Sequence, residues 1–225
     1  IGMVIAVSVT FLSVGNFSSG FIYVLIFLAI GGSIGAFIAY KIPMTAMPEL
    51  VAGFHSLVGL AAVFVAISAF INPEAFGLGT PGNIKLASLI EMAIGASVGA
   101  ITFSGSVIAF LKLQGIMSGA PITFKGQHIL NALILISILV LTYYLCLTQS
   151  PNLFWILIAV SFLIGFLIII PIGGADMPVV ISMLNSYSGW AAAGIGFTLE
   201  NTALIITGAL VGSSGACLLY TSDAA

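Results

Sequence analysis

The feature that most constrains this chain is its series of long apolar segments with very few charged residues between them. Charged residues make up 4% of the 225 residues, and hydrophobic residues make up 61%. A soluble domain carries charge on roughly a quarter of its positions, so this chain lacks the polar residues needed for a water-exposed surface. The sequence therefore predicts a protein embedded in a lipid bilayer.

Eight apolar segments lie between clusters of proline, glycine, asparagine and charge. A helix needs about 20 mostly apolar residues to cross a bilayer. Stretches such as 21–39 and 153–170 lack the alternation of polar and apolar residues that is typical of a membrane β-barrel. We predict an all-α, polytopic transmembrane bundle of about eight helices with short loops. The predicted helices span residues 1–11, 21–40, 47–71, 86–113, 128–147, 153–170, 178–199 and 202–220.

Several kinds of site are not expected in this chain. Four lysines and no arginine leave no electrostatic footprint for nucleic acid. Cys146 and Cys217 stand singly in apolar runs, which indicates neither a metal site nor a redox pair. No glycine-rich GxGxxG motif follows a predicted strand, so we expect no dinucleotide site, no bound cofactor and no catalytic residue here.

The lysines predict how the chain is oriented. Lys41, Lys112 and Lys125 lie in or beside connections on one side of the predicted bundle, while Lys85 lies on the other. Cytoplasmic loops carry an excess of lysine and arginine, so the side with three lysines is predicted to be cytoplasmic. Both chain ends and the connection with Asp176 fall on that side.

His55 and Asn185 are the two strongly polar side chains expected well inside the bilayer. The helical neighbours of His55 are Ala52, Gly59 and Ala62, a stripe of small residues that predicts contact with another helix. An imidazole takes up and releases protons near neutral pH, so His55 is predicted either to carry protons or to bond a carbonyl of a neighbouring helix. Asn185 does not titrate and either orients the histidine or a water, or joins two helices.

A serine-glycine cluster in the last segment lies at a similar predicted depth. At 1.5 Å per residue, His55, Asn185 and this cluster are each about 8–12 Å from the cytoplasmic surface. Three helices therefore offer polar groups at one level. The cluster consists of Ser213, Ser214 and Gly215.

Three carboxylates lie at predicted helix ends. Glu49 and Asp176 are at cytoplasmic ends, and Glu91 is near the opposite end of its segment. Each is either an ordinary charge at a helix terminus or a group at the mouth of a path through the bundle.

Small residues recur four positions apart in three segments. This spacing lets helix backbones approach closely in a membrane, and it predicts tight helix packing without indicating any chemistry. The pairs are Gly31 with Gly35, Gly95 with Gly99, and Gly208 with Gly212.

Three longer motifs resemble one family. MPELVAGFHSLVGLAAV (47–63), GGADMPVVISMLNSYSGWAAAGIGF (173–197) and TGALVGSSGA (207–216) are similar to the membrane domain of the β subunit of proton-translocating NAD(P) transhydrogenase. The resemblance implies a proton-carrying domain, covering residues 1–220, that is coupled to hydride transfer between NAD(H) and NADP(H) on domains outside this chain. It further implies that His55 and Asn185 serve the proton path. Asp176, Ser213, Ser214 and Gly215 would couple that path to an NADP(H)-binding domain.

The same resemblance implies partners, a location and incomplete ends. The family pairs this subunit with membrane helices and an NAD(H)-binding domain of an α subunit, in a dimer of αβ units, and the bacterial inner membrane is the expected location. The family has a further helix before Ile1 and an NADP(H)-binding domain after the last helix, so we expect truncated ends. Residues 217–225 do not resemble the family and are expected to be an artefactual end.

Two other classes of function stay open from the residues. A small-solute or ion transporter without redox coupling would show internal repeats and broken helices, and no convincing repeat is present. A structural subunit of a respiratory complex would use the same polar residues only to join helices.

Overall fold

Eight α-helices make up almost all of the described structure, a computed structural model that covers residues 2–14 and 20–222. They confirm the all-α prediction, and each predicted segment corresponds to one helix. The chain divides into two compact units, which are residues 1–46 and residues 47–225.

The first unit contains two helices and one short turn. These are α1 (Gly2–Val14), α2 (Gly20–Lys41) and the 3-10 turn η1 (Met44–Ala46). The Phe11 and Phe21 rings pack edge to face with centroids 5.1 Å apart. An added methyl group on Gly31 or Gly35 would meet nothing within 4 Å. The first unit alone does not test the tight packing at this glycine pair, which stays a prediction.

The second unit contains six long helices and one small hairpin. The helices are α3 (Met47–Ile71), α4 (Leu86–Leu113), α5 (Gln127–Thr148), α6 (Pro151–Ile169), α7 (Met177–Thr198) and α8 (Thr202–Ser222). The 3-10 turn η3 (Gly174–Asp176) precedes α7. Helix α8 runs on through residues 217–222, and the rest of the predicted artefactual end lies outside the described residues.

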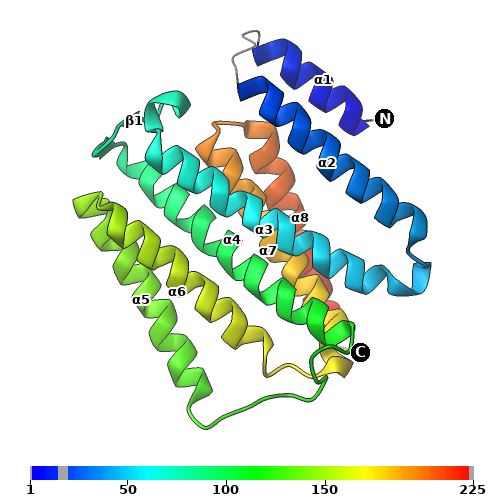
Figure 1. Ribbon diagram of the computed structural model, residues 1–225. Helices are drawn as coiled ribbons and strands as arrows, with labels where there is room; N and C mark the ends of the chain where they lie inside the picture. The colour runs from blue at the N-terminus through cyan, green and yellow to red at the C-terminus, as the bar shows by residue number, and fades with distance from the viewer. Residues whose placement is uncertain (1, 15–19, 223–225) are drawn as a thin grey trace. The chain divides into compact units, whose positions relative to one another are not determined.

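Helix α4 is the centre of this unit and packs against α3, α5, α6 and α7, while α8 packs against α7 (Figure 1). Small residues make the close contacts possible. A methyl group on Gly59 would lie 2.6 Å from the Gly99 carbonyl oxygen, and one on Gly194 would lie 2.8 Å from the Gly95 Cα atom. The predicted role of the Gly95 and Gly99 pair is thus confirmed, because helices that approach this closely leave no room for a side chain.

The connection between α3 and α4 folds into a small structure that the sequence analysis did not predict. The 3-10 turn η2 (Pro73–Phe76) leads into antiparallel strands β1 (Gly79–Thr80) and β2 (Asn83–Ile84). Gly77 and Gly82 have φ angles of 70° and 82°, which favour glycine. The Gln149 carboxamide forms two hydrogen bonds with the backbone of Ile84 in β2. Its Nε2 donates to the Ile84 carbonyl (3.1 Å), and its Oε1 accepts from the Ile84 N–H (2.9 Å).

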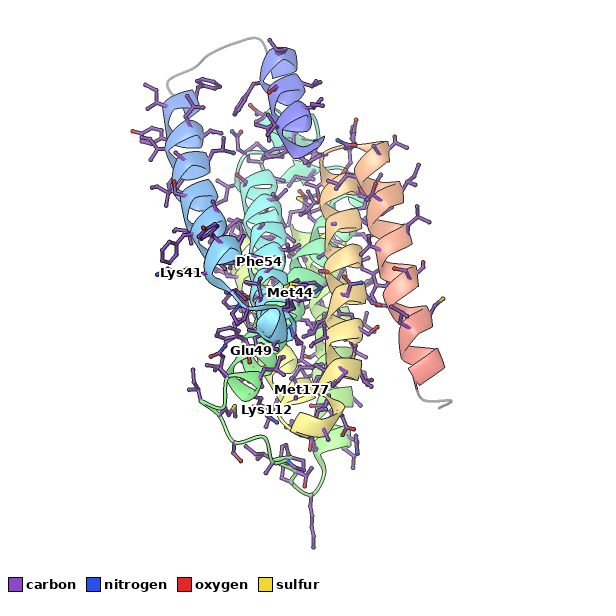
Figure 2. The ribbon with its side chains drawn as sticks, turned by 90° about the vertical axis from the view of Figure 1, so that its right-hand side faces the viewer. Lys41, Met44, Glu49, Phe54, Lys112 and Met177 are labelled. Atoms are coloured by element: carbon purple, nitrogen blue, oxygen red, sulfur yellow. The ribbon has the colours of Figure 1, made fainter. Side chains whose placement is uncertain are left out.

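At the end of the unit opposite the hairpin, a lysine that is only 5% exposed connects α4 to the segment between α6 and α7. Lys112 Nζ donates to the carbonyl oxygens of Ile170 (2.5 Å) and Ile172 (2.7 Å), so the end of α4 is bonded to the connection between α6 and α7. We call this the Lys112 end. Glu49 at the start of α3, Lys112 and Met177 at the start of α7 all lie at this end (Figure 2).

Five of the described helices are long and apolar enough to cross a membrane, which makes the chain an integral membrane protein. They are α2, α3, α4, α5 and α6. Helix α7 is a continuous helix of 22 residues, but its sequence contains serines, an asparagine and glycines that lower its mean hydropathy. The most polar of the long helices is therefore the one that carries Asn185.

Candidate functional site

His55 and Asn185 form a hydrogen-bonded pair between α3 and α7. The distance from His55 Nε2 to Asn185 Oδ1 is 3.2 Å, and both side chains are half-buried. The two residues are 130 positions apart in the sequence. No described residue bonds the other ring nitrogen of His55, Nδ1.

The small-residue stripe beside His55 explains how the pair forms. Ala52, Gly59 and Ala62 are all buried, and Gly59 lies directly against α4. Because this face of α3 carries no bulky side chain, α3 approaches α4 and α7 closely enough for one imidazole to reach across. His55 lies eight residues after the start of α3 and Asn185 eight after the start of α7. Both are therefore about 12 Å from the Lys112 end.

A third polar group at this level, Ser106 of α4, was missed by the sequence analysis. Gly59 lies against Phe103 and Gly53 lies against Phe110, so Ser106, one turn after Phe103, faces α3 near the level of His55. Ser106 is 0% exposed, and no described residue bonds its hydroxyl. Its spacing of seven from Gly99, on the face that contacts α3, is the signal that could have identified it.

Helix α8 contributes backbone contacts at the same level. Ser182 Oγ donates to the Gly215 carbonyl oxygen at 2.9 Å. An added methyl group on Gly215 would collide with Ser186, whose buried hydroxyl has no partner among the described residues. Ser182 and Ser186 flank Asn185 on α7, so Gly215 lies at the depth of the histidine pair.

The other residues of the predicted serine-glycine cluster point elsewhere. Ser213 Oγ bonds the Ala209 carbonyl and Ser214 Oγ bonds the Val211 carbonyl, both within α8, and both serines are exposed. Hydroxyls in membrane helices often bond the preceding turn in this way. Of the three residues, Gly215 alone has a described contact with α7.

The three predicted carboxylates are separate from the pair. Glu49 accepts a hydrogen bond from Gln114 Nε2, which joins the start of α3 to the end of α4. Asp176 is exposed at the N-terminus of α7 and makes no side-chain cap. Glu91 is half-buried near the start of α4, at the opposite end of the unit from Lys112. Glu49 lies six residues before His55, or about 9 Å along the helix.

The described residues contain no group of three histidine, cysteine or acidic side chains that could hold a metal ion. A neutral pair of imidazole and carboxamide with a nearby hydroxyl has a different use. Each of these groups both donates and accepts hydrogen bonds. Such a set of side chains can pass protons or orient water, and it carries no charge until the imidazole takes up a second proton.

Comparison with known proteins shows which family this chain resembles in sequence. The family described as NAD(P) transhydrogenase beta subunit matches residues 1–225. Two curated relatives, from Rhodospirillum rubrum and from one of its strains, are each described as NAD(P) transhydrogenase subunit beta. Each is 59% identical over 220 residues, which is 98% of this chain and 47% of the relative. The chain thus spans about half the length of the curated relatives it matches.

Proposed function

Since the chain belongs to the NAD(P) transhydrogenase beta subunit family, we propose that it is the part of this enzyme that conducts protons across the membrane. The observation that carries the proposal is the hydrogen bond between His55 and Asn185, which lies about 12 Å inside the bundle. A titratable side chain held inside a membrane by a neutral partner is costly. A role in proton transfer accounts for that cost.

In this mechanism His55 is the intermediate proton carrier. A proton that arrives at Nδ1, which no described residue bonds, makes the ring an imidazolium, and the Nε2 proton then leaves to a water beside Asn185. The ring is left neutral with its proton on Nδ1, and a ring rotation or a change of tautomer prepares it for the next proton. The carboxamide serves both forms of the ring, because its oxygen accepts from a protonated Nε2 and its NH₂ group can donate to an unprotonated one. A carboxylate at this position would hold the proton by charge, whereas the neutral amide releases it.

Ser106 extends this path into α4. Its hydroxyl is buried at the level of the pair and can both donate and accept a hydrogen bond. Water between Ser106 and the histidine would complete the connection. Glu49 at the Lys112 end and Glu91 at the opposite end are proposed as the groups nearest the two mouths.

Coupling to redox chemistry would run through α7 and α8. Ser182 and Ser186 contact Gly215 on either side of Asn185, so a shift of α8 along α7 changes the position of the asparagine. Asp176, Ser213 and Ser214 would relay this movement to an NADP(H)-binding domain in the part of the protein beyond this chain. NAD(H) would bind to an α subunit, and the αβ units would form a dimer in a bacterial inner membrane.

The test compares the two histidines of the chain in the full-length enzyme in proteoliposomes. His55→Ala is expected to abolish proton uptake driven by hydride transfer, measured with a pH-sensitive dye. His128→Ala is the matched control, because His128 is exposed and has no described partner. Normal proton uptake by His55→Ala would rule out the carrier role. Equal loss in both variants would mean that histidine replacement disturbs the fold.

A further inference from the structure

The end of α8 that is farthest from the Lys112 end is fixed to α7. The two helices are connected by residues 199–201 alone. The Asn201 N–H donates to the Gly196 carbonyl (2.8 Å), and the Asn201 side-chain oxygen accepts from the Leu204 N–H (3.1 Å). A methyl group on Gly196 would lie 2.7 Å from the Ile205 nitrogen. Because the backbones touch and the connection is bonded to both helices, α7 and α8 stay together at this end.

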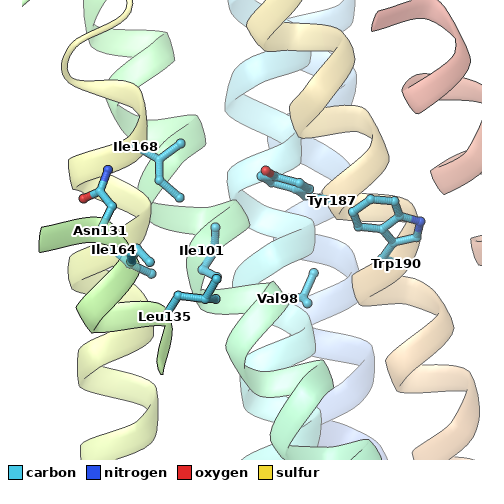
Figure 3. Close-up of a pocket in the computed structure, with 9 residues that line it drawn as sticks. Val98, Ile101, Asn131, Leu135, Ile164, Ile168, Tyr187 and Trp190 are labelled. Carbon is cyan, nitrogen blue, oxygen red and sulfur yellow. The ribbon is translucent and has the colours of Figure 1, made fainter. Parts of the chain in front are cut away.

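Trp190 of α7 holds the middle of α8. A methyl group on Gly212 would collide with the Trp190 ring, so the indole lies across α8 where α8 has no side chain. Tyr187 and Trp190 both project from α7 (Figure 3), and their ring centroids are 5.7 Å apart. Residues 177–186 of α7, which lie nearer the Lys112 end, include no aromatic residue. Smaller side chains therefore hold the rest of α8.

Between Gly212 and the Lys112 end, α8 contacts α7 at two serines. Ser182 Oγ donates to the Gly215 carbonyl oxygen at 2.9 Å. The Ser186 hydroxyl faces the Gly215 backbone, since a methyl group on that glycine would collide with the hydroxyl oxygen. Ser186 is 3% exposed, and no described residue bonds its hydroxyl. A buried hydroxyl without a partner is costly, and a water molecule would remove that cost.

Little else in the second unit restrains this half of α8. Its main described contact is with α7. Leu210, Ser213 and Ser214, on its other faces, are exposed. A movement of this half away from α7, with the connection at 199–201 as the hinge, would break the Ser182 bond. Water can replace a neutral bond of this kind with little loss.

We propose that the half of α8 between Gly212 and the Lys112 end is a gate, which swings away from α7 and admits water to the hydroxyls of Ser182 and Ser186. These serines lie about 7.5 Å and 13.5 Å from the Lys112 end, on either side of Asn185. The structure shows the closed form, in which Ser182 is bonded to Gly215. In the open form, water at the two serines connects the histidine pair to the surface at the Lys112 end. This use of the opening rests on the proposed function, whereas the opening itself does not.

The test is the rate at which a water-soluble maleimide labels Ser186→Cys in the full-length enzyme, with the other cysteines replaced by alanine. Ser182→Ala removes the bond that holds the gate closed and should raise this rate roughly fivefold. Ser182→Thr keeps a hydroxyl and should label at the original rate. Thr198→Cys is the matched control, because Thr198 is 2% exposed at the fixed end of α7 and should label at the same rate with or without Ser182→Ala.

A second measurement preserves the test if these variants fail to fold. Gly215→Ala places a methyl group against Ser186 and should lengthen the distance between spin labels at Ala175 and Ser214, measured by pulsed electron paramagnetic resonance. An unchanged labelling rate in folded Ser182→Ala, or an equal rise at Thr198→Cys, would overturn the proposal. If Ser182→Ala does not fold, an unchanged distance in Gly215→Ala would do so.

The two proposals can fail separately. The His55→Ala enzyme should lose proton uptake and still show the faster labelling of Ser186→Cys when Ser182→Ala is added. Normal proton uptake in His55→Ala would therefore count against the proton carrier alone, and unchanged labelling would count against the gate alone.

Discussion

Replacement of Asn185 by leucine tests the hydrogen bond at the centre of the proposed proton path. Leucine keeps the bulk of the side chain and removes both polar atoms. The bond from Ser188 Oγ to the Asn185 carbonyl involves only the backbone of residue 185, so it remains. The change is therefore confined to the contact with His55.

The size of the effect follows from the geometry. A neutral hydrogen bond of 3.2 Å is at the long end of the normal range, and it contributes about 1 kcal/mol. If Asn185 acts by orienting the imidazole, the rate of proton transfer should fall roughly fivefold, since about 1.4 kcal/mol corresponds to a factor of ten. The two substitutions should also be coupled. In a double-mutant cycle of His55→Ala and Asn185→Leu on the free energy of unfolding, the interaction energy should be about 1 kcal/mol.

The assay is proton uptake by the full-length enzyme in proteoliposomes, measured alongside hydride transfer in detergent. Asn152→Leu is the control, because Asn152 is exposed in the first turn of α6, away from the Lys112 end. An unchanged rate in Asn185→Leu would refute the orienting role. Strictly additive effects in the cycle would show that the hydrogen bond has no energetic significance. A loss of about a hundredfold or more would mean that the carboxamide itself is an obligatory relay.

Three further predictions concern packing and coupling. Lys112→Met removes the donor to the Ile172 carbonyl and leaves the Ile170 carbonyl with the Ile122 N–H alone (3.4 Å), and it should lower the free energy of unfolding by about 2 kcal/mol. A denaturant titration that shows no larger loss than exposed Lys85→Met would contradict this. Gly59→Leu should destabilise the protein by roughly 1–3 kcal/mol because α3 must move away from Gly99. Ala61→Leu, at an exposed position of the same helix, should be neutral in the same titration. Gly215→Val should lower the ratio of proton uptake to hydride transfer by separating α8 from Ser182, and an equal ratio in this variant and in Ser214→Ala would argue against coupling through Gly215.

The helices could be predicted from the sequence because the bilayer imposes one rule on every segment. Each crossing must satisfy its own backbone hydrogen bonds within about 20 apolar residues, so hydropathy and turn residues located all eight. Contacts between segments follow no such rule. Gly95 and Gly99 lie four positions apart on α4, yet Gly99 packs against α3 and Gly95 against α7.

Candidate site residues could be predicted where their residue type is rare in membrane helices, and not where it is frequent. A histidine and an asparagine are unusual inside a membrane, so His55 and Asn185 were recognisable one by one. Ser106 was missed because serines are frequent in such helices and usually bond their own backbone. Its position at the level of His55 depends on the register of α3 against α4, which the contacts of Gly53 and Gly59 show.

The Gln149 side chain that pairs with Ile84 has a consequence for biosynthesis. The loop between α3 and α4 cannot reach its final form until a residue 65 positions later has been translated and α5 has entered the bilayer. At about 5–20 residues per second this delay is on the order of several seconds. During that interval the nascent chain exposes an unfinished loop at the far side of the membrane from its ribosome, if the lysines orient it as predicted. A truncation before Gln149 should therefore be more accessible to protease at this loop than one that ends just after α6.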